Sequence, residues 1–254
     1  MRLGTWALPD GDVHFCKKCT SPSGKYGIII EAINIIYEEE IHMNENRVKR
    51  NQLLGAQMVK NLHARNMEGY YAETKEEALA KALEWIPEGA SVAWGGSMSI
   101  QEIGLKDAIC QGSYKVYNRE DAKTPEEKQR LELAAYDCDY FLTSANAIAE
   151  DGIIVNIDGR GNRVSAIASG PRNVLMIVGM NKVVKDADAA VSRARNEAAP
   201  INAQRFNLET PCAKTGQCFD CKHPQTICCQ FLITRFSKQP GRIKVILVNE
   251  ELGF

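Results

Sequence analysis

The chain has 254 residues, of which 44% are hydrophobic and 25% are charged, as in an ordinary globular protein. The 31 Lys and Arg residues nearly balance the 32 Asp and Glu residues, which argues against a general nucleic-acid-binding protein. No apolar run reaches the roughly 18–20 residues of a membrane-spanning helix, and no secretory signal pattern opens the chain. We therefore expect a cytoplasmic protein without membrane insertion, whose nine cysteines are reduced.

Residues 1–42 do not continue the pattern found in the rest of the chain. Cys16 and Cys19 form a single CxxC motif without a second pair, which favours an accessory arm over a metal site. Glu38–Glu40 can be encoded by purine-rich codons that contain a ribosome-binding sequence, and they end shortly before Met43. We therefore hypothesise that Met43 is the natural start and that residues 1–42 are a non-native extension, an accessory N-terminal arm being the alternative.

From residue 43 onward, segments with helical periodicity alternate with short apolar segments of strand length. Helices are expected over about 45–65, 74–85, the segment after Ser97, 124–136 and 186–198, the last one ending before Pro200. Strands are expected over 69–72, 91–94, 115–118, 140–143, 153–157, 174–178 and 244–248. This alternation predicts one α/β domain over residues 43–254, with a mostly parallel sheet and flanking helices.

A pair of glycines ends the predicted strand over 91–94 and leads into a serine-rich helix start. Gly95 and Gly96 allow a ligand to approach the backbone, and Ser97 and Ser99 can cap the helix. Free N–H groups and the helix dipole favour a carboxylate or phosphate at such a place. A plain strand–helix turn is the alternative, and Glu102 is expected to cap its helix unless it transfers protons.

Small polar side chains follow the ends of two further predicted strands. Each of them alone is typical of a turn, but together they can orient a small polar ligand above the glycine pair. The candidates for ligand binding are Ser144, Asn146, Asn156, Gly159 and Asn162, and those for proton transfer are Asp151 and Asp158. Ser144 has no evident histidine partner among the four histidines of the chain, which argues against a Ser–His–acid hydrolase.

A cysteine-rich insert over residues 211–229 is the strongest break in composition. Cys218 and Cys221 form a CxxC motif that can turn two thiolates toward one centre, and Cys212 and Cys228 can complete a shell of four sulfurs. Adjacent cysteines seldom point the same way, so only one of Cys228 and Cys229 is expected to bind. Four thiolates suit zinc or an iron–sulfur cluster, while reduced thiols in a mobile loop or a disulfide framework are the alternatives.

These segments together resemble the lactate-utilisation (LUD) domain family. The matching motifs are GGSMSIQE at 95–102, TSANAI at 143–148, the turn at 156–163, PCAKTGQCFDC at 211–221 and VILVNEELGF at 245–254. The resemblance covers residues 43–254 and implies a fold related to sugar-phosphate isomerases, glucosamine-phosphate deaminases and CoA transferases. Members of that superfamily bind anionic ligands at glycine-rich strand–helix turns.

The resemblance also implies a role in oxidising L-lactate to pyruvate, beside partners that carry iron–sulfur clusters. The chain lacks the tandem cysteine runs of ferredoxin-bearing members and the glutamate nucleophile arrangement of a CoA transferase. The leading hypothesis is an accessory subunit of lactate or hydroxy-acid oxidation. It would bind a small anionic metabolite, hold an iron–sulfur cluster or zinc, and associate with iron–sulfur oxidoreductase subunits. The alternatives are an isomerase-like enzyme acting on a phosphorylated or carboxylated sugar, and a non-catalytic ligand-sensing or scaffold protein.

Overall fold

The computed structural model of the chain describes residues 45–254, so the expectations for residues 1–42 lie outside the described part. The first described element is a helix over 45–63, close to the predicted range. Met58 and Leu62 of this helix are fully buried, whereas Leu53, which the periodicity also places on the apolar face, is exposed.

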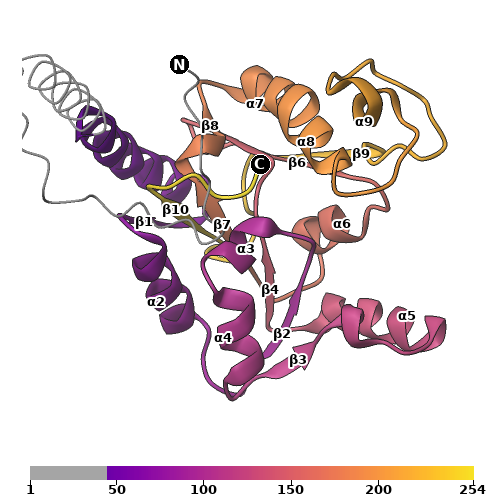
Figure 1. Cartoon of the computed structure of the whole chain (residues 1–254). Helices are drawn as coiled ribbons and strands as arrows, with labels where there is room; N and C mark the ends of the chain where they lie inside the picture. The colour runs from indigo at the N-terminus through magenta and orange to yellow at the C-terminus, as the bar shows by residue number, and fades with distance from the viewer. Residues whose placement is uncertain (1–44) are drawn as a thin grey trace, which may run out of the picture. The chain divides into compact units, whose positions relative to one another are not determined.

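A six-stranded sheet forms the centre of the domain, and every neighbouring pair of its strands is parallel (Figure 1). Its order is β1-β10-β7-β4-β2-β3. The strands are β1 (Glu68–Ala72), β2 (Ser91–Trp94), β3 (Lys115–Tyr117), β4 (Tyr140–Thr143), β7 (Asn173–Gly179) and β10 (Ile243–Val248). The prediction of an α/β fold with a mainly parallel sheet is thus confirmed.

Both faces of the sheet are buried, which explains why its central strands are apolar without alternation. In β7, Leu175 and Ile177 belong to the cluster that contains residues of α2 (Lys75–Trp85), α3 (Met98–Glu102) and α4 (Leu105–Gln111). Met176 and Val178, which alternate with them, belong to the cluster on the other face.

Most helices begin where the sequence indicates. Thr74 caps α2 by accepting a hydrogen bond from the Glu77 amide at 3.2 Å, and Thr124 caps α5 (Pro125–Ala134) in the same way. The segment after Ser97 forms two short helices rather than one. Gly104, whose φ of 75° favours glycine, separates α3 from α4.

A second, four-stranded sheet in the order β8-β5-β6-β9 was not predicted from the sequence. It contains β5 (Ala147–Ala149), β6 (Ile154–Asp158), β8 (Val183–Val184) and β9 (Gln230–Thr234), with β6 antiparallel to β5 and β9. The tight turn expected after β6 leads into a further helix, α6 (Asn162–Ala168). The Asp158 carboxylate stabilises the start of α6 by accepting hydrogen bonds from the amides of Arg163 and Val164.

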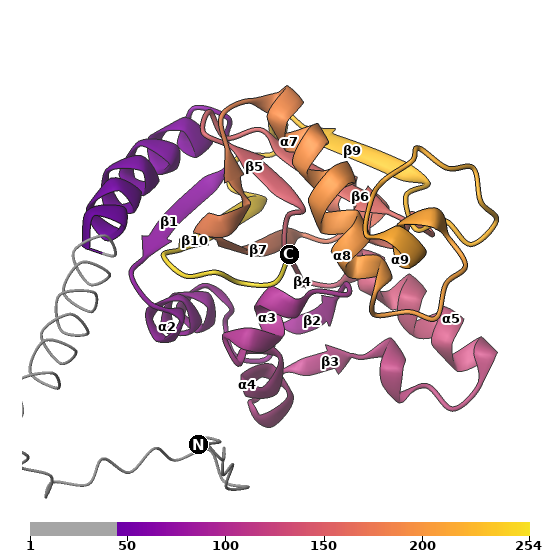
Figure 2. The same ribbon diagram turned by 45° about the horizontal axis from the view of Figure 1, so that its top comes forward.

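The prediction that Pro200 ends a helix is wrong. The chain continues from α7 (Ala187–Arg193) through a π-helical turn, Ala194–Ala198, into α8 (Ala199–Ala203). Pro200 lies in the first turn of α8, directly after the π-helical turn. Figure 2 shows α7 and α8 near α9 (Pro211–Thr215), which begins the cysteine-rich segment. Three 3₁₀ turns complete the fold: Arg119–Asp121, Ala135–Asp137 and Met180–Lys182.

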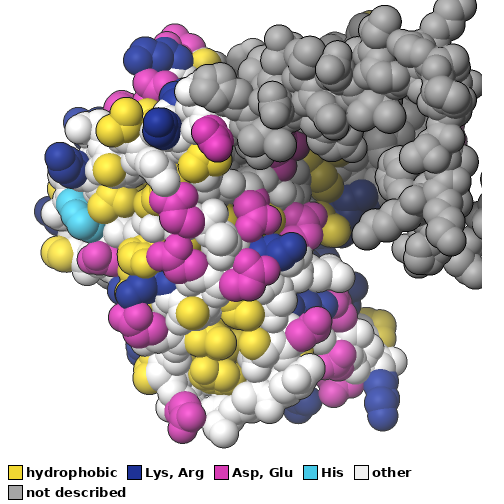
Figure 3. Space-filling model, turned by 60° about the vertical axis from the view of Figure 1, so that its left-hand side comes forward, with side chains coloured by type: hydrophobic (Ala, Val, Ile, Leu, Met, Phe, Trp, Pro, Cys, Tyr) yellow, Lys and Arg dark blue, Asp and Glu magenta, His cyan; other side chains and the backbone are white. Residues whose placement is uncertain are grey.

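The surface carries charges of both signs among apolar side chains, as the face drawn in Figure 3 illustrates. Within residues 45–254, every helix is too short or too polar to serve as a membrane span.

Candidate functional site

A pocket lies where four neighbouring strands of the parallel sheet end. Because β10, β7, β4 and β2 are parallel neighbours, the segments that follow them emerge at the same edge, the usual ligand-binding edge of such sheets. The residues from these segments that line the pocket are Gly96, Ser97, Ser144, Asn146, Lys182 and Gly253. The structure thus brings Gly96, Ser97, Ser144 and Asn146, all predicted from the sequence, to one place.

The two glycines of the predicted anion-binding turn have different roles. Gly95 is buried, and a Cβ added there would lie 2.9 Å from Cδ of Arg163. Gly96 is exposed, and an added Cβ would meet nothing within 4 Å. Among residues 45–254, the backbone N–H groups of Gly96 and Ser97 have no protein acceptor. Gly95 therefore leaves room for Arg163, while Gly96 leaves backbone N–H groups open to a ligand.

Three basic side chains, Lys182, Arg163 and Arg205, line the same pocket, and none of them was among the predicted binding residues. Lys182 ends the 3₁₀ turn after β7 and is only 2% exposed. Its Nζ donates hydrogen bonds to Oγ of Ser99 at 2.9 Å and to Oγ of Ser144 at 3.1 Å. Burial, helped by the charge of Arg193, lowers the pKa of the Lys182 ammonium from 10.5 to about 7.

The other two bases are Arg163, on α6, and Arg205, which follows α8. Arg163 is mostly buried and donates from Nη2 to Oδ1 of Asn146 and to the Ile157 carbonyl. Burial lowers its pKa, although the nearby Asp158 opposes this change. Arg205 is exposed, and its guanidinium lies 5.9 Å from the ring centre of Phe254. Since none of the described Asp and Glu side chains lines the pocket, its side chains favour an anionic ligand.

Two further predicted residues, Ser99 and Asn156, do not line the pocket but contact residues that do. Ser99 is fully buried and holds Lys182, while Ser97, rather than Ser99, caps α3. Asn156 is also fully buried, and its Nδ2 donates to the Ser144 carbonyl at 2.9 Å. Its Oδ1 has no hydrogen-bond partner among the described residues. Both residues therefore position Ser144 or Lys182 instead of lining the pocket.

None of the three acids proposed for proton transfer lines the pocket. Glu102 does not cap its own helix as expected, because its Oε2 accepts a hydrogen bond from the Gly253 amide at 2.7 Å. Asp158 caps α6, and Asp151 pairs with Arg65 at 2.6 Å in the turn between β5 and β6. The geometry gives no support to their catalytic role, which stays a prediction.

The last two predicted binding residues also lie outside this pocket. Gly159 contacts the cysteine-rich segment, since an added Cβ would lie 3.3 Å from the backbone of Ile227. Asn162 lines a separate small hollow together with Tyr136 and Phe141.

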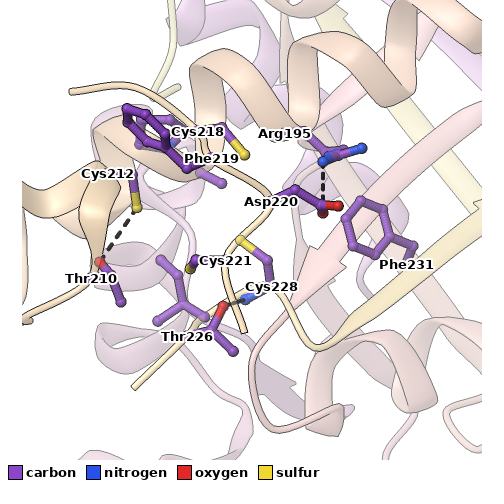
Figure 4. Close-up of a pocket in the computed structure, with 13 residues that line it drawn as sticks. Arg195, Thr210, Cys212, Cys218, Phe219, Asp220, Cys221, Thr226, Cys228 and Phe231 are labelled. Carbon is purple, nitrogen blue, oxygen red and sulfur yellow. Dashed lines mark hydrogen bonds and ion pairs between the residues drawn. The ribbon is translucent and has the colours of Figure 1, made fainter. Parts of the chain in front are cut away.

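The cysteine-rich segment forms a second pocket, and all four predicted ligands line it (Figure 4). They come from α9, from the loop after it and from the segment just before β9: Cys212, Cys218, Cys221 and Cys228. The neighbouring Cys229 is exposed and outside the pocket, in line with the expectation that adjacent cysteines diverge. An ion pair of 2.8 Å between Arg195 and Asp220 ties this loop to the π-helical turn.

The four thiols line one pocket, but their sulfurs do not converge closely enough to bind a single ion. Burial, together with the neighbouring cysteines of the segment, raises the pKa of the Cys228 thiol to about 11. Within the described residues, no group of three or more His, Cys, Asp or Glu side chains is close enough to hold one metal ion. The described cysteines are all free thiols, and none of them forms a disulfide.

The basic residues of the anion pocket escaped the sequence reading for identifiable reasons. Lys182 lies close after the predicted strand over 174–178, so its position at a strand end could be predicted. Arg163 lies on α6 and Arg205 follows α8, and the sequence predicted neither helix. A basic residue could therefore be placed at the pocket only where the neighbouring strand or helix was predicted correctly.

The family model described as the LUD domain matches residues 55–248. A search of curated proteins finds no match. Among solved structures, the chain is similar to a DUF162 family protein from Deinococcus radiodurans, at 13% identity and a TM-score of 0.47, over 78% of this chain and 98% of that chain. Because the family model covers most of the sequence, the chain belongs to the LUD domain family.

Proposed function

We propose that this LUD domain protein binds a small carboxylate metabolite at the strand-end pocket and acts as an accessory subunit in the oxidation of lactate or a related hydroxy acid. One observation carries the proposal. Lys182, Arg163 and Arg205 line the same pocket as the open backbone of Gly96 and Ser97. Guanidinium groups and free backbone N–H groups are the donors that proteins use to bind carboxylates.

The size of the pocket favours a small acid over the isomerase alternative. Its volume is about 50 Å³, well below the roughly 300–1,000 Å³ of pockets that enclose drug-sized ligands. A three-carbon hydroxy or oxo acid suits this space better than a sugar phosphate. An isomerase would also need an acid or base beside the substrate, and Glu102, Asp151 and Asp158 are engaged elsewhere.

The cysteine pocket fits an iron–sulfur cluster better than a zinc ion. Around one zinc ion, Zn–S bonds of about 2.3 Å bring the sulfurs within roughly 4 Å of one another. The described side chains have no such close group, although four thiols line one pocket. A [4Fe–4S] cluster attaches each thiolate to a different iron atom and so holds the sulfurs further apart. Cys212, Cys218, Cys221 and Cys228 would hold it, and the bound group would supply single-electron transfer.

Ligand screening tests the anion site. We expect L-lactate and pyruvate to raise the melting temperature of the protein, because both would bind only the folded state. A sugar phosphate of similar charge should have little effect, since it exceeds the pocket. A shift with the sugar phosphate alone would favour the isomerase reading, and no shift with any of these anions would favour a scaffold without a ligand.

Metal analysis of anaerobically purified protein tests the cysteine site. We expect iron and acid-labile sulfide, with broad visible absorption, in the wild type and in Cys229→Ser. Cys218→Ser and Cys221→Ser should each lose most of the iron, because both thiols line the pocket and Cys229 does not. Zinc without colour would contradict the cluster, and equal iron in all four proteins would remove these cysteines from the ligand shell.

A further inference from the structure

Lys182 is a buried amine whose hydrogen bonds suit its neutral form. Among the described residues, its Nζ donates hydrogen bonds to two partners, Oγ of Ser99 and Oγ of Ser144. Each hydroxyl donates its own proton to a backbone carbonyl: Ser99 to Leu252 at 3.2 Å, and Ser144 to Ala145 at 3.4 Å. Both hydroxyls are therefore acceptors toward the lysine.

A neutral amine has two N–H donors and one lone pair. The two serines use both donors of Lys182, so the lone pair has no partner among residues 45–254. An ammonium would have a third N–H donor, and among residues 45–254 no ion pair with an acid is recorded for Lys182. An unsatisfied donor on a buried charged group costs more than an unsatisfied lone pair on a neutral amine, which favours the neutral form.

The charges around Lys182 act in the same direction. Arg193 and Arg163 oppose protonation of the amine, and of the nearby acids only Glu102 favours it. Burial is the largest cause, and the pKa falls to about 7. Desolvation and neighbouring cations activate lysines as nucleophiles in the same manner in enzymes that form Schiff bases.

We propose that Lys182 condenses with the carbonyl carbon of a 2-oxo acid bound in this pocket, forming an imine. This inference rests on the proposed function, because the acid's carboxylate would be held by Arg163 and Arg205. The Nζ lone pair forms a bond to the carbonyl carbon, and the carbonyl oxygen leaves as water with the two protons that the nitrogen gives up. The hydroxyls of Ser99 and Ser144 are placed to relay these protons, and no oxidant or reductant is consumed.

The imine would distinguish pyruvate from L-lactate, although the carboxylates of both would bind in the same way. Pyruvate has the carbonyl and would bind both covalently and through its carboxylate. L-Lactate has a hydroxyl in its place and would bind through the carboxylate alone. The lysine thus gives the pocket a means to distinguish the oxidised acid from the reduced one.

Reductive trapping tests the inference on the intact protein. Wild-type protein is treated with pyruvate and sodium cyanoborohydride, and the product is examined by intact mass and peptide mapping. We expect one adduct on Lys182, whose added mass equals that of pyruvic acid less one oxygen atom. L-Lactate should give no adduct. Lys185→Arg, which changes an exposed lysine outside the pocket, should be labelled like the wild type, and Lys182→Arg should not.

The outcomes separate this inference from the function on which it rests. If pyruvate binds by calorimetry but leaves Lys182 unlabelled, the imine is refuted and the anion site stands. If neither pyruvate nor lactate binds, both proposals fail. Labelling spread over surface lysines also refutes the inference. The peptide map is read from the wild type, so the result does not depend on whether Lys182→Arg folds.

Discussion

The buried amine of Lys182 should make the stability of this protein depend on pH in a defined direction. In the unfolded chain the amine has an ordinary pKa of 10.5, and in the folded protein burial lowers it to about 7. Between these values the unfolded state binds more protons than the folded state. The free energy of unfolding must therefore rise with pH, and the penalty from Lys182 is fully present only below about pH 7.

The size of the effect follows from the two pKa values. Raising the pH from about 7 to about 10 should increase the free energy of unfolding by roughly 3 kcal/mol through Lys182. Lys182→Met keeps an unbranched side chain without the charge, so its free energy of unfolding should not show this increase. Guanidinium chloride unfolding of both proteins, at the two pH values and with a reducing agent, measures the difference. All other titrating groups are shared and cancel in the comparison.

Lys185→Met provides the control, because this side chain is 80% exposed and pairs with Glu150 at 2.8 Å. Its pH dependence should run parallel to that of the wild type. Parallel curves for Lys182→Met as well would refute the reasoning, since they would mean that Lys182 is charged in the folded protein across this range.

Two further predictions concern the walls of the pocket. Gly95→Ala should destabilise the protein by about 1–3 kcal/mol, because the new methyl group would displace Arg163. Gly96→Ala should change the free energy of unfolding by less than about 0.5 kcal/mol. Chemical unfolding measures both variants, and equal destabilisation would contradict the roles assigned to the two glycines. Glu102→Ala should weaken pyruvate binding in calorimetry without abolishing the fold, because the Gly253 amide loses its acceptor, and unchanged binding would show that Gly253 needs no such support.

The parallel sheet was predictable because its strands are buried on both faces. The apolar run over 174–178 and the capping threonines at 74 and 124 are local signals, and the structure confirms each. The second sheet has weaker signals. Its strand β9 has two large apolar residues, Phe231 and Ile233, exposed, and its partner β6 is distant in sequence. Such pairing depends on tertiary contacts that no local pattern contains.

The residues at the strand ends of the candidate site were predictable from the sequence, but its basic side chains were not. Gly96, Ser97, Ser144 and Asn146 follow predicted strands, so the rule for parallel sheets brings them together. A proline after a helical pattern predicts a helix end at Pro200, but the helix continues through the π-helical turn, and Arg205 at its end lines the pocket.

Calorimetric titration of pyruvate into wild type, Arg205→Gln and Arg160→Gln tests the central claim most directly. Arg205 lines the pocket and is exposed, so its loss should weaken binding without unfolding the protein. Arg160 is 70% exposed and pairs with Glu132 away from the pocket. We predict one site in each protein, with an affinity about tenfold lower in Arg205→Gln, equivalent to about 1.4 kcal/mol, and unchanged in Arg160→Gln. Equal affinities in all three proteins, or no binding to the wild type, would contradict the account.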